Sequence, residues 1–287
     1  MKKLKQIYWG LCSQIHQITE IFTFRYNNLF SNKKITGDKN NPVVSLTTYG
    51  KRVNSVFLTI ESIAQGTMLP SRIILWLDDP LIFEYQPESL KRLVNRGLEI
   101  RLCENFGPHT KYFPYIESEN HLELPLVTAD DDVIYPKNWF VMLYEAWKSN
   151  PEYINAHGAR RITFSDGNID AYLSWRYCEN TEPSFRNFAL GIFGVIYPPE
   201  FQNELKSAGR SFLNHCPKAD DIWLHATAIR TGFKIKQISN SLIRGVIDTP
   251  DTQDMALFHT NQFSGGNDKQ IRNTYNDNDY SLLMSER

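Results

Sequence analysis

The sequence predicts an α/β fold in which a mixed, mainly parallel sheet is flanked by helices. The first observation is a strand, a helix and a strand in succession: an apolar segment from Val43, a helical stretch over 56–64, and a second apolar segment over 72–77. Such a βαβ unit implies two parallel strands joined by a right-handed crossover. The second observation is that apolar segments end in polar or acidic residues, and ligands of open α/β sheets collect at these carboxyl ends.

The segment from Leu126 to Pro136 carries the strongest functional signal. Here an apolar strand ends in three consecutive aspartates, Asp130, Asp131 and Asp132. Adjacent anions repel one another strongly at low dielectric unless a cation lies among them. A divalent ion with oxygen ligands, Mn²⁺ or Mg²⁺, relieves this repulsion and also holds a substrate phosphate. Taken alone, the segment is equally compatible with a solvated acidic turn.

Residues 128–136 resemble the Asp-x-Asp metal motif of nucleotide-sugar-dependent glycosyltransferases with the GT-A fold, and the chain is similar to bacterial glycosyltransferase family 2. The resemblance implies a Rossmann-like GT-A fold for the α/β unit. It also implies that Asp130 and Asp132 bind the metal, and that Asp130 and Asp131 contact the nucleotide sugar.

Other segments follow in the order of that family. The resemblance implies nucleotide contacts from the turn after the first strand: Thr47, Thr48, Tyr49 and Arg52. Arg52 is otherwise a surface charge at a helix start. Asp78 and Asp79 either contact the base or simply end the second strand. After a third predicted strand over 98–102, Lys111 matches a lysine that approaches the donor diphosphate, although by itself it is an ordinary surface lysine.

A second acidic site lies between Lys218 and Ile235 and resembles the segment that places the catalytic base of inverting GT-A enzymes. Asp221 aligns with that base, and Asp220 stands where the family has glutamate. Trp223 fills an aromatic slot near the acceptor. From the residues alone, Asp221 opens a helix whose positive end favours a carboxylate. The alternative is an ordinary acid in a first helical turn.

The apolar run over 188–197 contains Gly191 and Gly194, which indicate either close approach of the backbone to a ligand or a strand with a bulge. The resemblance implies that this region lines the donor sugar and the acceptor. It also implies that the preceding loop, about 177–190, orders on binding. Trp175 and Arg160 are further acceptor candidates, because a sugar can stack on an indole; the alternative for each is a structural role.

The first 40 residues form a separate basic unit in this prediction. They carry seven Lys or Arg and two acids, and apolar side chains recur at helical spacing from Leu4 to Phe22. This basic amphipathic helix, followed by a linker over 31–41, either lies on an anionic membrane surface through residues 1–25 or packs against a protein surface. Its apolar runs are shorter than the roughly 18 residues that span a bilayer, and no signal peptide is expected.

Composition narrows the class of protein. A net charge of −1 gives no reason to expect nucleic acid as a partner. Four cysteines without metal spacing fit a reducing cytoplasm, so we expect a cytoplasmic protein, peripheral on the inner face of the cytoplasmic membrane if the first helix binds lipid. In the tail, His259 either completes the metal shell, as the resemblance implies, or is structural.

Together these inferences predict a GT-A domain over 41–240, with a donor half (41–132) and an acceptor half (133–240), and a tail (241–287) that contributes to the active site. The implied reaction is metal-dependent, inverting transfer of a hexose or N-acetylhexosamine from a UDP-sugar to a glycan or lipid-linked acceptor, in bacterial lipopolysaccharide or capsule synthesis. One alternative, a sugar nucleotidyltransferase, needs a glycine-rich basic loop after its first strand, where this chain has one glycine. The other, a non-catalytic glycan-binding protein, needs neither acidic site.

Overall fold

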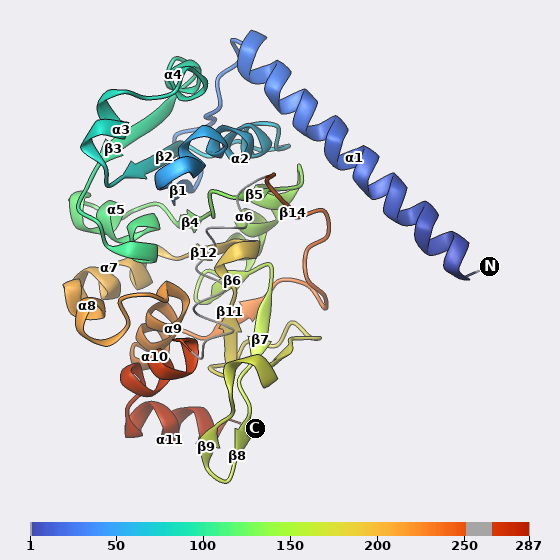
Figure 1. Ribbon diagram of the computed structural model, residues 1–287. Coiled ribbons are helices and arrows are strands. Elements are labelled where there is room, and N and C mark those ends of the chain that lie inside the picture. Colours follow the sequence, from blue (N-terminus) through green and yellow to red (C-terminus); the bar gives the residue numbers. More distant parts are fainter. Residues whose placement is uncertain (1, 251–265, 287) are drawn as a thin grey trace.

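A computed structural model describes residues 2–250 and 266–286, built around a seven-stranded sheet in the order β13-β6-β12-β4-β1-β2-β3 (Figure 1). Its strands are β1 (Val43–Thr47), β2 (Arg72–Leu77), β3 (Leu98–Leu102), β4 (Leu126–Thr128), β6 (Ile154–Ala156), β12 (Val195–Tyr197) and β13 (Ile235–Gln237). Strands β1 to β4 pair in parallel, as do β6 and β13, whereas β12 runs antiparallel to both β4 and β6. The predicted mixed, mainly parallel sheet is confirmed.

Both faces of the sheet are covered by helices, which explains why its central strands β1, β2 and β4 are mostly apolar. Because successive side chains point to opposite faces, Val44 and Ile73 join one core cluster while Val43 and Ile74 join the other. The first cluster is closed by α2 (Val56–Ala64), α4 (Glu88–Val94) and α6 (Trp139–Ser149). The second is closed by α5 (Phe113–Ser118), α7 (Pro199–Ala208) and α9 (Asp220–Arg230).

Smaller elements surround the carboxyl ends of the central strands. A three-stranded antiparallel sheet has the order β10-β7-β11, from β7 (Ala159–Arg161), β10 (Arg176–Tyr177) and β11 (Asn187–Ala189). Two-stranded pairs join β5 (Val133–Ile134) to β14 (Ile247–Asp248), and β8 (Phe164–Ser165) to β9 (Asn168–Ile169). The remaining helices are α3 (Pro80–Glu84), α8 (Phe212–His215), α10 (Gly266–Thr274) and α11 (Asp277–Ser285). Short 3₁₀ turns are η1 (Gly50–Asn54), η2 (Gly107–Lys111), η3 (Tyr172–Ser174), η4 (Gly191–Phe193) and η5 (Gly209–Ser211).

The N-terminal helix α1 (Lys2–Phe30) extends away from the sheet and meets the domain only near its C-terminal half (Figure 1). Phe24, 3% exposed, packs on Leu58 of α2 and Ile134 of β5. The buried Asn28 side chain donates to Glu61 Oε1 at 3.2 Å. Among the residues that the structure describes, no helix is both long and apolar enough to cross a membrane.

Residues 31–41, which we predicted as a linker, are partly built into the core. Ile35 is fully buried in the cluster of α2 and α4, and its backbone N–H donates to Arg96 O at 3.0 Å. Arg96 in turn forms a buried ion pair with Glu61 at 2.5 Å. Residues 31–41 thus connect α1 to β1 without a helix or a strand, and the buried Ile35 side chain anchors this connection beneath α2 and α4.

Candidate active site

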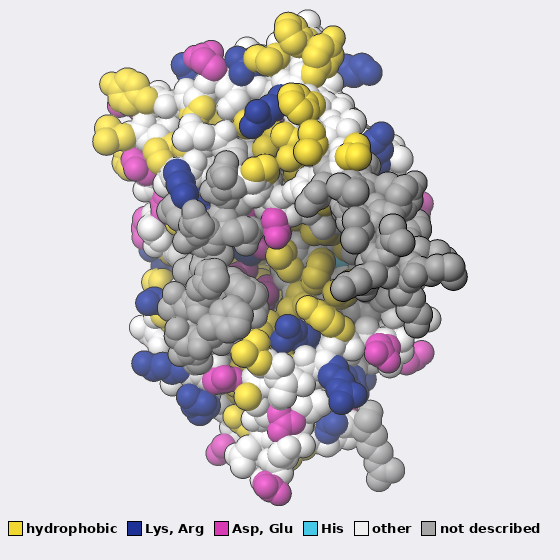
Figure 2. Space-filling view, turned by 45° about the vertical axis from the view of Figure 1, so that its right-hand side comes forward, with side chains coloured by type: hydrophobic (Ala, Val, Ile, Leu, Met, Phe, Trp, Pro, Cys, Tyr) yellow, Lys and Arg dark blue, Asp and Glu magenta, His cyan; other side chains and the backbone are white. Residues whose placement is uncertain are grey.

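The carboxyl ends of β1 and β4 open into a cleft with a volume of about 730 Å³. Acidic and hydrophobic side chains meet in a hollow near the centre of the face shown in Figure 2. The central sheet contributes Thr47, Tyr49, Arg52, Asp78, Lys111, Asp130, Asp131 and Asp132 to its lining. The opposite side contributes Arg160, Tyr172, Tyr177, Phe188, Leu190, Ile192, Phe193, Asp220, Asp221 and Asn267, while Asp248 lies beside Asp132. The two predicted acidic sites, about 90 residues apart in the chain, therefore face one cleft.

Arg52 holds two of the three consecutive aspartates. Its Nη1 lies 2.9 Å from Asp131 Oδ1, and its Nη2 lies 2.9 Å from Asp132 Oδ2. The second oxygen of Asp131 accepts from Thr48 Oγ1 at 2.5 Å. Burial and the neighbouring Asp130 charge raise the pKa of Asp132 to about 7, although Arg52 opposes this rise. One guanidinium therefore does not fully compensate the negative charge at this end of β4.

Lys111 connects the third aspartate to the second acidic site. Its Nζ lies 2.6 Å from Asp130 Oδ1 and 3.0 Å from Asp220 Oδ2. Burial disfavours the ammonium charge, but the carboxylates of Asp130, Asp220 and Asp221 outweigh it and raise the pKa of Lys111. The lysine is a fixed cation between the end of β4 and the start of α9.

The aromatic support of Asp130 comes from the residues that follow it. The Asp130 backbone N–H donates to Tyr135 Oη at 2.9 Å. The Tyr135 ring stacks on Trp139 with centroids 4.1 Å apart, and both side chains are buried. Tyr135 therefore fixes the direction in which the acidic turn leaves β4.

Asp221 stands in the first turn of α9 and faces η4. One of its carboxylate oxygens accepts from the Gly191 backbone N–H at 3.2 Å. A Cβ at position 191 would lie 2.8 Å from Asp221 Oδ1, so this glycine leaves room for the carboxylate. Burial and the adjacent Asp220 charge raise the pKa of Asp221 to about 8. A carboxylate with its pKa near neutral pH is suited to accept a proton from a weakly acidic hydroxyl.

Two donor-side predictions are corrected by the geometry. Thr48 is buried behind the cleft, and its hydroxyl donates a hydrogen bond to Asp131 instead of contacting a ligand. Asp79 caps α3, accepting from the backbone N–H of Leu81 at 2.8 Å, so its alternative role at the end of the strand is the correct one. Asp78 lines the cleft in its place. Thr47, Tyr49, Arg52 and Lys111 lie where the sequence placed them, at the cleft.

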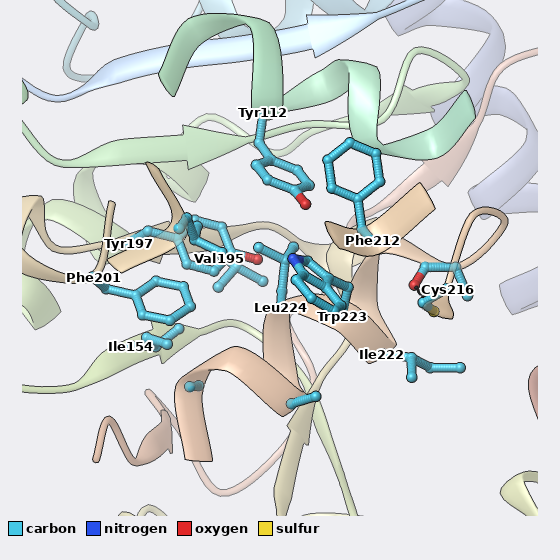
Figure 3. Packing of buried hydrophobic residues seen from close by; sticks show 14 of the residues in the cluster. Tyr112, Ile154, Val195, Tyr197, Phe201, Phe212, Cys216, Ile222, Trp223 and Leu224 are labelled. Carbon is cyan, nitrogen blue, oxygen red and sulfur yellow. Dashed lines mark hydrogen bonds between the residues drawn. The ribbon is translucent and has the colours of Figure 1, made fainter. Parts of the chain in front are cut away.

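Three acceptor-side predictions are also corrected. Trp223 is buried in the core beside Phe212, and Figure 3 shows its indole among apolar side chains instead of at the cleft. The Trp175 indole N–H donates to Asp170 O at 3.0 Å. The side chain is 3% exposed, so neither face of the ring is free for a sugar. Gly194, with φ of 96°, lies against the Trp139 indole, which a Cβ would overlap. Packing accounts for that glycine, because no Cβ fits beside the ring.

Asp248 was not predicted at the cleft, and Arg160 was predicted there only as one of two alternatives. Arg160 lines the cleft, with its guanidinium 5.0 Å from the Tyr172 ring centroid and 5.2 Å from that of Tyr177. Asp248 arrives on β14 opposite Val133, next to Asp132, and its neighbour Thr249 donates its backbone N–H to Asp132 O at 2.8 Å. No local sequence signal marks Asp248, since β14 exists only through its pairing with β5. His259 lies outside the described residues.

The described residues supply part of a metal site. Across 2–250 and 266–286, no three His, Cys, Asp or Glu side chains converge to hold one ion. Asp130 and Asp132 nevertheless offer the carboxylate oxygens that Mg²⁺ and Mn²⁺ prefer. Asp130, Asp131 and Asp132 line the same cleft as Asp248, which lies beside Asp132 on β14, so acidic side chains gather at this point. This donor set fits a hard divalent cation that takes further oxygens from a ligand such as a diphosphate.

No protein-family model and no curated protein matches the chain. Among solved structures, the fold is similar to the crystal structure of GalNAc-T7 with UDP, GalNAc and Mn²⁺, with a TM-score of 0.50 and 13% sequence identity. The similarity covers 70% of this chain and 42% of that chain, so this protein spans less than half the length of the protein it resembles. At this identity the likeness shows the fold, a Rossmann-like α/β architecture of the GT-A kind.

Asp221→Asn is expected to stabilise the fold at pH 8 by roughly 1–2 kcal/mol, since it removes a buried charge. The raised pKa means that the folded protein keeps this proton to higher pH than the unfolded chain. Wild-type stability therefore falls through this group as pH rises from about 4 to about 8. Thermal unfolding of both proteins between pH 5 and pH 9 should show the difference shrinking toward pH 5.

A second variant, Asp220→Asn, breaks the 3.0 Å ion pair with Lys111 and also removes a charge that helps to raise the pKa of Asp221, so the fall in stability with rising pH should be smaller in this variant. A gap between wild type and Asp221→Asn that stays constant with pH would contradict the assigned pKa.

Proposed function

We propose that this protein is an inverting glycosyltransferase that moves a hexose or N-acetylhexosamine from a UDP-sugar to a hydroxyl of a glycan or lipid-linked acceptor. One observation carries the proposal. Lys111 contacts both Asp130 and Asp220, so a site suited to a diphosphate directly adjoins a buried carboxylate suited to accept a proton. The fold likeness to a structure with UDP, GalNAc and Mn²⁺ supports it. The family resemblance supports a setting in bacterial lipopolysaccharide or capsule synthesis.

The donor would lie along the ends of β1 and β4. Thr47, Tyr49 and Asp78 line the part of the cleft that would receive the nucleoside. Arg52 and Lys111 supply fixed cations beside the position of the diphosphate, which gains negative charge as it leaves. Mn²⁺ or Mg²⁺, held by Asp130 and Asp132, would add Lewis-acid stabilisation of the same leaving group.

The acceptor would approach from the side of α9. Asp221 takes the proton of the acceptor hydroxyl while that oxygen bonds to the anomeric carbon, and the bond from that carbon to the diphosphate breaks on the opposite face. This order of events inverts the anomeric configuration. Tyr172, Ile192 and Phe193 form an apolar wall beside Asp221, against which a sugar ring can pack.

Asp221→Asn should reduce transfer by about 10²–10⁴-fold, because the variant cannot accept the acceptor proton. The substitution keeps the size of the side chain, so affinity for UDP should stay within about twofold. Rates would be measured with Mn²⁺ and a panel of UDP-sugars, and the anomeric configuration of the wild-type product by NMR.

The control is Asp79→Asn, which removes a carboxylate that caps α3 outside the cleft and should leave the rate unchanged. Near-normal transfer by Asp221→Asn, or retained configuration in the product, would overturn the role of this residue.

Asp132→Asn should abolish the dependence of UDP binding on Mn²⁺ while leaving the fold intact. The variant also releases one guanidinium arm of Arg52, which can bind UDP without metal. The decisive quantity is therefore the ratio of the UDP dissociation constants with and without Mn²⁺, measured by calorimetry. Asp79→Asn again serves as control, and an unchanged ratio in Asp132→Asn would exclude the metal assignment.

We also propose that the protein is cytoplasmic and binds an anionic membrane through α1. Phe24 and Asn28 dock this helix on the domain, whereas Ile15, Ile18 and Phe22 are each more than half exposed on another side of the helix. The N-terminal sequence adds three lysines, Lys2, Lys3 and Lys5. On the face of the molecule shown in Figure 2, hydrophobic side chains gather toward the top. Exposed apolar residues with nearby basic ones are typical of an interfacial helix.

The full-length double variant Ile18→Ser with Phe22→Ser should sediment less with anionic liposomes at low salt than the wild type does. Leu213→Ser is the matched control, because it removes an exposed leucine far from α1. Deleting residues 1–40 is a poorer test, since it would also remove Phe24 and Ile35 from the core. Equal sedimentation of wild type and double variant would refute membrane binding by this face.

A further inference from the structure

The three-stranded sheet β10-β7-β11 has two faces of different character. Residues directly opposite one another in antiparallel strands point to the same face, and successive residues alternate. Register therefore groups one set of side chains on the face toward the cleft: Arg160, Tyr177 and Phe188. The same register groups the next set on the reverse face: Arg161, Arg176 and Asn187.

The reverse face forms the floor of a second hollow of about 1020 Å³. Its lining includes all three of these side chains, and Tyr177 lines both this hollow and the cleft. The strand that carries Tyr177, β10, is the edge of the three-stranded sheet. An elongated ligand can therefore pass around this edge from one hollow to the other.

Arg161 and Arg176 lie directly opposite each other, an arrangement of like charges that costs stability unless an anion offsets it. Among the residues that the structure describes, neither guanidinium forms an ion pair with a carboxylate. Arg161 is held in place by Asn187, whose Oδ1 accepts from its Nη1 at 3.0 Å. Asn187 is itself buried and donates to Glu182 O and Ile235 O. Arg161 is thus oriented by a buried amide, and Arg176 faces it from the edge strand β10.

None of the four acids that line the second hollow forms an ion pair with these arginines among the residues that the structure describes. Glu286 is engaged by Lys234 at 2.7 Å and by the Ser184 hydroxyl. The Asp170 carboxylate is held by the hydroxyls of Thr163 and Ser165. Glu179 and Glu182 are exposed, as Arg176 is, so solvent and salt screen all three charges. Arg161 and Arg176 therefore keep their guanidinium groups available to a ligand.

We propose that the second hollow binds an anionic group, a carboxylate or a phosphate, on an acidic glycan whose reacting end lies in the cleft. Guanidinium pairs suit such groups, because each can form a bidentate contact with planar or tetrahedral oxyanions. The glycan would run past Tyr177 at the edge of the sheet. The identification of the ligand as an acceptor glycan rests on the proposed glycosyltransferase function; the anion site itself does not.

The test is calorimetric binding of an oligogalacturonate, a neutral oligosaccharide of equal length, and inorganic phosphate to the full-length protein. Arg176→Gln and Arg161→Gln should each weaken oligogalacturonate binding by roughly tenfold, since each removes a charge-assisted contact. Arg210→Gln is the matched control: it removes one exposed positive charge that pairs with Glu104 and Glu117 elsewhere, and should change the affinity little. The exposed Arg176 can be replaced without disturbing the core, so this variant stays informative if Arg161→Gln folds poorly.

The outcomes separate this inference from the proposed reaction. Equal losses in Arg176→Gln and Arg210→Gln, or equal affinity for acidic and neutral oligomers, would overturn the anion site. Phosphate that binds as tightly as the oligomer would show that a small free anion, instead of a glycan, is the ligand. Selective oligogalacturonate binding by a protein that transfers no sugar from any UDP-sugar would overturn the reaction and leave the site standing.

Discussion

One lysine contacts two carboxylates that lie far apart in the chain, and this contact stabilises the centre of the molecule. Lys111 reaches Asp130 at the end of β4 and Asp220 at the start of α9. Without this cation, the acidic turn and the first turn of the helix would repel each other across a partly buried space. Lys111 therefore offsets part of the repulsion between the two acidic segments that face the cleft.

The cleft has fewer positively charged than negatively charged side chains. Arg52 and Lys111 face Asp130, Asp131, Asp132, Asp220 and Asp221 at close range. Burial and neighbouring carboxylates raise the pKa of Asp132 and of Asp221 above the usual range, and the nearby cations only partly oppose this rise. Under the proposed function these are the groups that hold a metal ion and accept a proton. Many enzymes likewise carry groups at the binding site that lower the stability of the fold.

Most of the fold and the outline of the site were predictable, because they rest on local periodicity. The strand β3 and the helix α2 have the bounds that their apolar spacing indicates, and both acidic segments reach the cleft. Side-chain direction was less predictable. Trp175 and Trp223 are aromatic residues near the site in sequence, yet both fill the core. Whether an indole points inward depends on which elements pack against its own segment, here α9 for Trp223 and the end of η3 for Trp175, and the neighbouring residues in the sequence do not reveal this.

Asp248 shows why the remaining part of the site needed a structure, and it also relates the cleft to α1. Its strand forms through pairing with β5, and the Gln17 side chain of α1 donates to Asp248 O at 3.3 Å. The helix that carries the exposed apolar face therefore touches the segment that lines the cleft next to Asp132. The docked end of α1 and the cleft belong to one packed unit. A surface bound by the exposed face of α1 would therefore keep a defined position relative to the cleft.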